Sequence, residues 1–216
     1  MMDVILASNS PRRRQLLGLT GLVFQVLPAD VDEMPIDGES APHYVQRLAA
    51  SKAQAIAAQV DPETLIIAAD TTVVDGNQIL GKPVDNEDAA RMLQQLRGCN
   101  HQVYTAIALL RNGELLVECC GTDVPMRNYS DAEMQVYIES GDPLDKAGAY
   151  AIQHPGFHPV DNLQGCYANV VGLPLCHLVR ALRKLSIKLT DSVYLSCQSA
   201  LGYECPIYEA VLQEKL

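Results

Sequence analysis

The chain has 216 residues, of which 48% are hydrophobic, and its formal net charge at pH 7 is −10. This length and apolar content allow a substantial core, which excludes disordered and fibrous classes. The negative charge disfavours general binding to nucleic acid, which needs a basic surface. An anionic substrate would therefore have to be met by a local cluster of basic side chains.

Membrane, secretory and disulfide-rich classes are also disfavoured. No run of residues approaches the ~18 consecutive apolar positions of a membrane span, and the N-terminus lacks a signal-peptide pattern. The seven cysteines are odd in number and scattered, which predicts reduced thiols. The five histidines show no metal-ligand spacing and are interpreted as surface or packing residues. We expect a cytoplasmic protein with no membrane partner.

The first expected elements are a strand over residues 3–7 and a helix over 11–18. The strand is a short apolar run, and Ser10 and Pro11 are a typical N-cap and first-turn residue of a helix. The helix should therefore begin directly where the strand ends. Its free N–H groups then favour an anion at this junction.

The junction also carries polar and basic side chains. Ser8 can donate a hydroxyl, and Arg12 and Arg13 can donate from forked, permanently charged groups. These groups suit a polyphosphate better than a single carboxylate. The alternative is a solvated helix with an arginine-rich first turn, but cations are mildly unfavourable at a helix N-terminus and so need a reason.

The rest of the chain alternates between predicted strands and helices, which indicates an α/β fold with a mixed sheet. An amphipathic spacing predicts a helix over 42–59, and an apolar, β-branched run predicts a strand over 64–74. After residue 184 the pattern weakens, leaving either an ordered extra helix or an interaction tail. The other expected elements are strand 24–27, helix 86–96 capped by Asn86, hairpin strands 102–110 and 114–120 around Asn112-Gly113, a helix opened by the capping box Ser130–Glu133 and ending near Gly141, strands 149–152 and 167–171, and helix 173–184.

Four charged residues outside the first turn are candidates for chemistry. Asp70 lies inside an apolar strand, where an acid is costly to bury unless a partner or a metal compensates it. Lys52 borders the apolar face of its helix, so its head either reaches inward or snorkels to solvent. Glu33 ends an acidic run that is either solvated or ligates a hard cation. Lys82 follows a glycine in a loop, which alone is weak evidence of a site.

These segments together resemble the Maf family of nucleoside triphosphate pyrophosphatases, over roughly residues 3–184. Seven motifs in order carry the resemblance, which makes it specific. They are Ala7-Ser8-Asn9-Ser10-Pro11-Arg12-Arg13, Glu33, Lys52, Ala69-Asp70-Thr71, Lys82-Pro83, the run from Gly141 to Gln153, and the run from Tyr167 to Leu175.

The resemblance implies a strongly twisted, mixed central sheet with long hairpin strands and flanking helices, as in Maf and inosine triphosphate pyrophosphatases. It places the catalytic domain in residues 1–184, as one body or as two lobes around a cleft, and leaves 185–216 as an extension of unknown role. It implies hydrolysis of dTTP and UTP to the monophosphate and pyrophosphate, with a divalent cation such as Mg²⁺ or Mn²⁺. A homodimer is an open alternative to a monomer.

The resemblance also assigns roles to the candidate residues. Asp70 and Glu33 are implied to be catalytic and to hold the metal. Thr71 and Gln153 look like the subgroup that acts on dTTP and UTP, since an amide can pair with the imide edge of uracil or thymine. The remaining substrate-binding candidates are Ser8, Arg12, Arg13, Lys52 and Lys82.

Two further interpretations stay open at this point. One is 7-methyl-GTP pyrophosphatase activity, which another subgroup of the family has. The other is a nucleotide-binding regulator of cell division that lacks significant turnover. The sequence also departs from the usual family pattern at His154–Pro159. This segment replaces the glycines and apolar strand usual in the family and would reshape the rim of the base pocket.

Overall fold

The computed structural model describes residues 2–190 and 192–215. Six strands form one mixed sheet in the order β2-β1-β3-β5-β6, with β4 paired to β3. Strands β2, β1 and β3 run parallel, whereas the pairs β3–β5, β5–β6 and β3–β4 are antiparallel. The strands are β1 Val4–Leu6, β2 Gln25–Val26, β3 Leu65–Asp75, β4 Gln78–Leu80, β5 Asn100–Arg111 and β6 Glu114–Pro125. The expected mixed sheet with long hairpin strands is confirmed.

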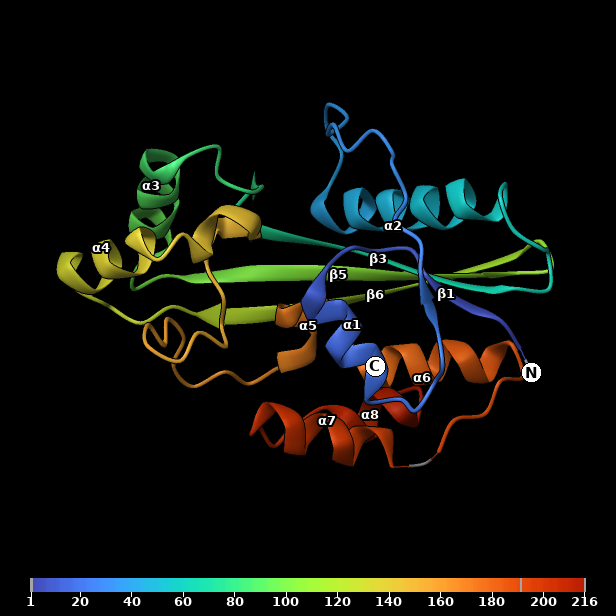
Figure 1. Ribbon diagram of the computed structural model, residues 1–216. Coiled ribbons are helices and arrows are strands. Elements are labelled where there is room, and N and C mark those ends of the chain that lie inside the picture. Colours follow the sequence, from blue (N-terminus) through green and yellow to red (C-terminus); the bar gives the residue numbers. More distant parts are fainter. Residues whose placement is uncertain (1, 191, 216) are drawn as a thin grey trace.

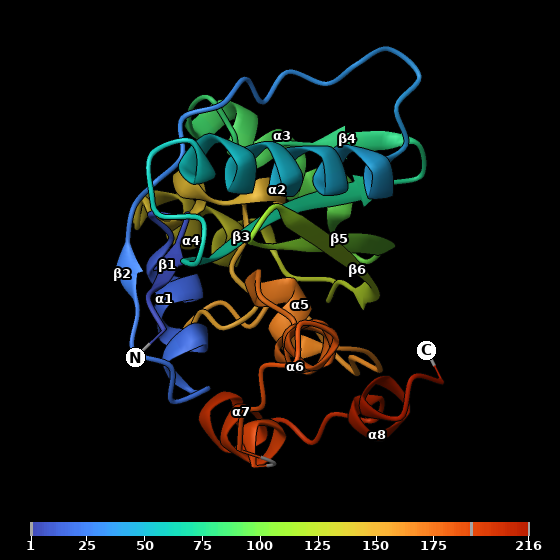
Figure 2. The same ribbon diagram turned by 90° about the vertical axis from the view of Figure 1, so that its right-hand side faces the viewer.

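Helices cover both faces of this sheet (Figures 1 and 2). Helix α2 (Ala41–Ala57) packs its apolar stripe on one face. Helices α5 (Tyr167–Val171) and α6 (Leu175–Lys184) lie on the other, and α1 (Pro11–Gly18) joins the same core. Helices α3 (Asn86–Leu96) and α4 (Asp131–Glu139) gather around one end of the long strands, where a second apolar cluster forms.

Most of the expected elements are present, with boundaries shifted by a few residues. Helix α1 begins at Pro11, and the Ser10 hydroxyl accepts from the Arg13 N–H at 3.4 Å, as an N-cap does. The capping box of α4 is formed in both directions between Ser130 and Glu133. The cap of α3 was expected at Asn86, but Asp85 provides it, accepting from the Asp88 N–H at 2.8 Å.

Two expected strands are wrong. Residues 167–171 form helix α5, because a five-residue apolar run does not distinguish a strand from a buried helical turn. Residues 149–152 form no strand: Gly148 and Ala149 both have positive φ and turn the chain away from an extended path. Gly148 is required there, since a Cβ at this position would lie 2.9 Å from Val73 Cγ1. The segment from η1 (Asp142–Asp145) through η2 (Ala147–Ala149) instead crosses beside β3.

The described residues after 184 include two helices that form an extra layer. Helix α7 (Val193–Leu201) buries Val193 and Cys197 in the core beneath the sheet, and α8 (Tyr208–Leu212) buries Val211. The Tyr203 hydroxyl lies 3.0 Å and 2.9 Å from the carbonyl oxygens of Leu163 and Gly165. Helices α7 and α8 meet the expectation of an extra helix, and a role of this segment in interactions stays a prediction.

Among the residues that the structure describes, no helix combines the length and the apolar character needed to cross a bilayer.

Candidate active site

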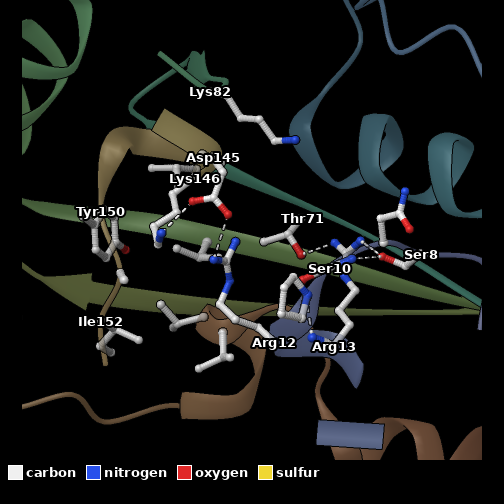
Figure 3. Close-up of a pocket in the computed structure, with 18 of the residues that line it drawn as sticks. Ser8, Ser10, Arg12, Arg13, Thr71, Lys82, Asp145, Lys146, Tyr150 and Ile152 are labelled. Carbon is white, nitrogen blue, oxygen red and sulfur yellow. Dashed lines mark hydrogen bonds and ion pairs between the residues drawn. The ribbon is translucent and has the colours of Figure 1, made fainter. Parts of the chain in front are cut away.

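A pocket of about 400 Å³ opens where β1, α1, β3 and the η1–η2 segment meet. It brings together side chains that lie far apart in the sequence (Figure 3). All nine predicted site residues line it or touch a residue that does. Eight of them are lining residues, namely Ser8, Arg12, Arg13, Glu33, Lys52, Thr71, Lys82 and Gln153.

Asp70 is the ninth predicted residue, and Lys52 connects it to the pocket. Lys52 Nζ lies 2.6 Å from Asp70 Oδ1 and 2.6 Å from Glu33 Oε1, so one ammonium group joins two carboxylates. Lys52 comes from α2 and Asp70 from the middle of β3, and both are buried, with 8% and 7% of their surface exposed. The head of Lys52 therefore reaches inward, and Asp70 has the basic partner that burial of an acid requires.

The two carboxylates differ in acidity because their surroundings differ. Burial raises the pKa of Asp70 above its usual value, and the charges of Lys52 and Arg13 only partly oppose this. Burial also acts to raise the pKa of Glu33, but the hydrogen bond and the charge of Lys52 outweigh it and lower that pKa. Asp70 is thus the better proton acceptor of the two. Its second oxygen, Oδ2, has no hydrogen-bond partner among the described residues.

Arg13 is anchored at one end of the pocket by three hydrogen bonds. Its guanidinium donates to the Gly172 carbonyl and to Thr71 Oγ1, both at 2.9 Å, and to Ser8 Oγ at 3.2 Å. The Thr71 hydroxyl is also 2.9 Å from Thr105 Oγ1. Thr71 therefore contacts Arg13 at this end of the pocket, and its expected part in base selection stays a prediction.

Arg12 extends along the pocket and pairs with Asp145, with 3.2 Å between Arg12 Nη1 and Asp145 Oδ2. Lys146 holds the same acid at 2.6 Å and donates to Asp142 Oδ1 at 2.9 Å. Lys82 is exposed at the rim and forms no ion pair within the described residues. Arg14 is exposed and does not line the pocket. Positive groups thus surround one part of the cavity.

The part of the pocket away from Ser8 and Arg13 has a different lining. Tyr150 and Ile152 lie there (Figure 3), and Val73, Val103 and Val170 contribute further apolar surface. Gln153 is exposed, and its amide has no hydrogen-bond partner among the residues that the structure describes. This end can accept a flat, partly apolar group and present one amide to its edge.

The donor set can be compared with the needs of a divalent cation. No group of three or more His, Cys, Asp or Glu side chains suited to a metal occurs in the described part of the chain. Mg²⁺ commonly takes only one or two carboxylates and completes its shell with substrate phosphates and water. Glu33 lines the pocket and Asp70 adjoins it through the shared Lys52, so these two carboxylates meet that requirement.

The sequence interpretation missed one pair in the pocket wall. Tyr150 lines the cavity, and its hydroxyl lies 2.8 Å from His101 Nε2. Of the two interpretations given to His101, surface or packing, the structure bears out packing, because the ring is buried and hydrogen-bonded. The available signal was its place at the start of an apolar strand, where a polar ring needs a partner.

Comparison with known proteins gives a consistent result. The sequence pattern of the family described as "Maf-like protein" matches residues 3–185. A protein of Anaeromyxobacter dehalogenans named "dTTP/UTP pyrophosphatase" is 46% identical over 190 residues, which covers 86% of this chain and 95% of that protein. A protein of Dehalococcoides mccartyi with the same name is 47% identical over 186 residues, covering 85% of this chain and 82% of that protein.

Among solved structures, a nucleoside-triphosphatase / dITP/XTP pyrophosphatase from Mycobacterium abscessus aligns with a TM-score of 0.43 and 17% identity, over 86% of this chain and 95% of that one. A likeness at this level supports no conclusion about this chain.

Proposed function

Because the chain belongs to the Maf family, we propose that it hydrolyses dTTP and UTP to the corresponding monophosphate and pyrophosphate. One observation carries the proposal: Lys52 holds two carboxylates at 2.6 Å in a pocket whose wall also contains two arginines. Cationic groups alone would bind a triphosphate. A buried acid with a raised pKa beside them adds a group able to handle a proton.

The residues at the arginine end would hold the phosphates. Arg13 is preorganised by its three hydrogen bonds, so little side-chain freedom is lost when an anion binds. Arg12 would exchange its pairing with Asp145 for a phosphate, and Lys82 would close over the same charge from the rim. Ser8 and the first-turn N–H groups of α1 would donate to phosphate oxygens. Charge that develops on the leaving pyrophosphate is thereby neutralised.

Asp70 would orient the water that attacks the α-phosphorus and accept its proton. Its Oδ1 is held by Lys52, which leaves Oδ2 for the water. The raised pKa makes Asp70 a stronger base than an ordinary aspartate. Glu33 and Asp70 would hold a divalent cation such as Mg²⁺ or Mn²⁺, which supplies electrostatic stabilisation of the phosphate charge when bound.

The base would lie at the opposite end, in the apolar part of the pocket. Gln153 would pair with the imide edge of uracil or thymine through one donor and one acceptor. The function and the site are attributed to residues 1–184, with 185–216 as an extension of unknown role. Access to nucleotide pools implies a cytoplasmic location, and whether the protein is a homodimer stays a prediction.

The test is release of pyrophosphate from dTTP, UTP, CTP, GTP and 7-methyl-GTP, each with Mg²⁺, with Mn²⁺ and with excess EDTA. We expect turnover of dTTP and UTP that EDTA abolishes and added Mg²⁺ or Mn²⁺ restores. Nucleotide binding without pyrophosphate release would instead support the regulator of cell division. Preferential turnover of 7-methyl-GTP would support the other family subgroup.

A further inference from the structure

Tyr150 lies at the end of the pocket away from Ser8 and Arg13, where apolar side chains and Lys146 line the cavity. Tyr150 lines the cavity and is buried, with Lys146 and Ile152 near it and Ser8 and Arg13 at the opposite end (Figure 3). Its hydroxyl makes one hydrogen bond within the described residues, to His101 Nε2 at 2.8 Å. A phenol oxygen can both donate and accept, so one more hydrogen-bonding position is open.

The tautomer of His101 determines whether the Tyr150 oxygen donates or accepts in this hydrogen bond. The ring is 2% exposed, and burial lowers the pKa of His101 to about 4, so the imidazole is neutral at pH 7. Its Nδ1 has no hydrogen-bond partner in the described part of the chain. His101 does not line the pocket, so a proton on Nδ1 would find no acceptor in the described part of the chain or in the contents of the pocket, whereas the Tyr150 O–H belongs to a residue that lines the pocket. The proton of the neutral ring therefore belongs on Nε2.

With that tautomer, His101 Nε2–H donates to the Tyr150 oxygen. The hydrogen bond from His101 takes one position on the phenol oxygen and leaves another for the proton of Tyr150 itself. The Tyr150 proton then takes the other position and has no acceptor among the described residues. An unpaired buried donor is costly, so this O–H requires an acceptor from the contents of the pocket.

We propose that the Tyr150 hydroxyl, oriented by His101, donates a hydrogen bond to the carbonyl oxygen at position 4 of the bound base and so selects uracil and thymine against cytosine. This inference rests on the proposed function. Uracil and thymine carry carbonyl oxygens at positions 2 and 4, whereas cytosine carries an amino group at position 4. At position 4 the amino group of cytosine would face the Tyr150 O–H, so two donors would oppose each other. Gln153, exposed at the rim, would read a different part of the same edge.

The test compares Tyr150→Phe with a matched control, Tyr129→Phe. Tyr129 is another buried tyrosine, but its hydroxyl donates to the Leu93 carbonyl at 2.6 Å, and it does not line the pocket. We expect Tyr150→Phe to reduce kcat/KM for UTP and dTTP by about tenfold, mainly through KM, and to leave that for CTP unchanged or higher. Tyr129→Phe should keep the ratio of UTP to CTP at the parental value.

Two variants of the histidine separate orientation from packing. His101→Gln retains an N–H that can donate to the Tyr150 oxygen, and we expect it to keep most of the discrimination between UTP and CTP. His101→Met fills similar space without a donor and should relax the discrimination about as much as Tyr150→Phe does. A purely structural role for His101 would give the same substrate ratio in both variants.

The outcomes distinguish this inference from the proposed function. A parental protein that releases pyrophosphate from neither UTP nor dTTP would contradict the function and the inference with it. An active parental protein whose UTP to CTP ratio is unchanged in Tyr150→Phe would overturn the inference alone. An equal loss on every triphosphate in Tyr150→Phe would do the same, since it would indicate general damage to the pocket.

Discussion

Replacing Asp70 with Asn tests the buried carboxylate of the site most directly. The two side chains have nearly the same shape, and an Asn oxygen can still accept from Lys52 Nζ, which lies 2.6 Å from Asp70 Oδ1. The negative charge and the capacity to accept a proton are lost. A positioned acid or base typically contributes 100-fold or more. We therefore expect turnover to fall by about 100-fold, which corresponds to about 2.7 kcal/mol in the activation free energy.

The same substitution should leave the fold intact, and the pKa of Asp70 explains why. Because burial raises this pKa, the folded protein binds the proton of Asp70 more tightly than the unfolded chain does. The contribution of Asp70 to stability therefore falls as pH rises from its ordinary pKa through its folded pKa. An asparagine at position 70 is neutral at every pH, so the variant does not lose this contribution to stability as the pH rises. We expect a Tm at pH 7 equal to or above the parental value.

The assay is pyrophosphate release from saturating UTP and dTTP, together with a thermal melt of each protein. Asp123→Asn is the control, because Asp123 is an exposed acid on β6 that accepts from Gln102 Nε2 at 3.0 Å, outside the pocket. Turnover of Asp70→Asn within threefold of the parental rate would refute the assignment of Asp70. A large fall in Tm accompanying lost activity would refute the account of its charge.

Three further substitutions test other parts of the structure. Lys52→Met removes a charge that opposes the raised pKa of Asp70, so the acidic limb of the pH–rate profile should move to higher pH; an unmoved limb would contradict this. Gln153→Ala should lower turnover of UTP and dTTP relative to CTP and GTP in the triphosphate panel, and constant ratios would exclude base reading. Gly148→Ala places a Cβ 2.9 Å from Val73 Cγ1 at a φ of 68°, which should cost roughly 2–4 kcal/mol and lower the Tm by about 5–10 °C in a thermal melt.

Local chemistry determined much of the fold. The pair Ser10-Pro11 sets the start of α1, and the capping box at Ser130 sets the start of α4, because both act through contacts within one turn. The turn Asn112-Gly113 has positive φ at both residues, which these two residue types tolerate, and so it registers β5 against β6. Asp70 was recognisable as a site residue because an acid inside an apolar strand demands compensation.

Only the tertiary structure determined which residue compensates the buried charge of Asp70. Lys52 lies 18 residues before Asp70 on α2, and the packing of α2 on the sheet determines that its ammonium group reaches both Asp70 and Glu33. The pairing of His101 with Tyr150 joins residues 49 apart in sequence. The residues next to His101 and Tyr150 in the sequence do not indicate that these two side chains pair.

The short apolar run at residues 167–171 shows the same limit for secondary structure. Within five residues, the pattern fits a strand or a buried helix equally well. In the structure this run forms helix α5. Its buried Asn169 stabilises the helix against the sheet, because the amide donates to the Val103 carbonyl and to Thr122 Oγ1 at 2.9 Å each. The sequence by itself thus determined the elements whose stabilising contacts are local, together with the residue types of the site. The tertiary structure decided the pairings, because a buried polar group is satisfied by whichever partner the packing of distant elements brings to it.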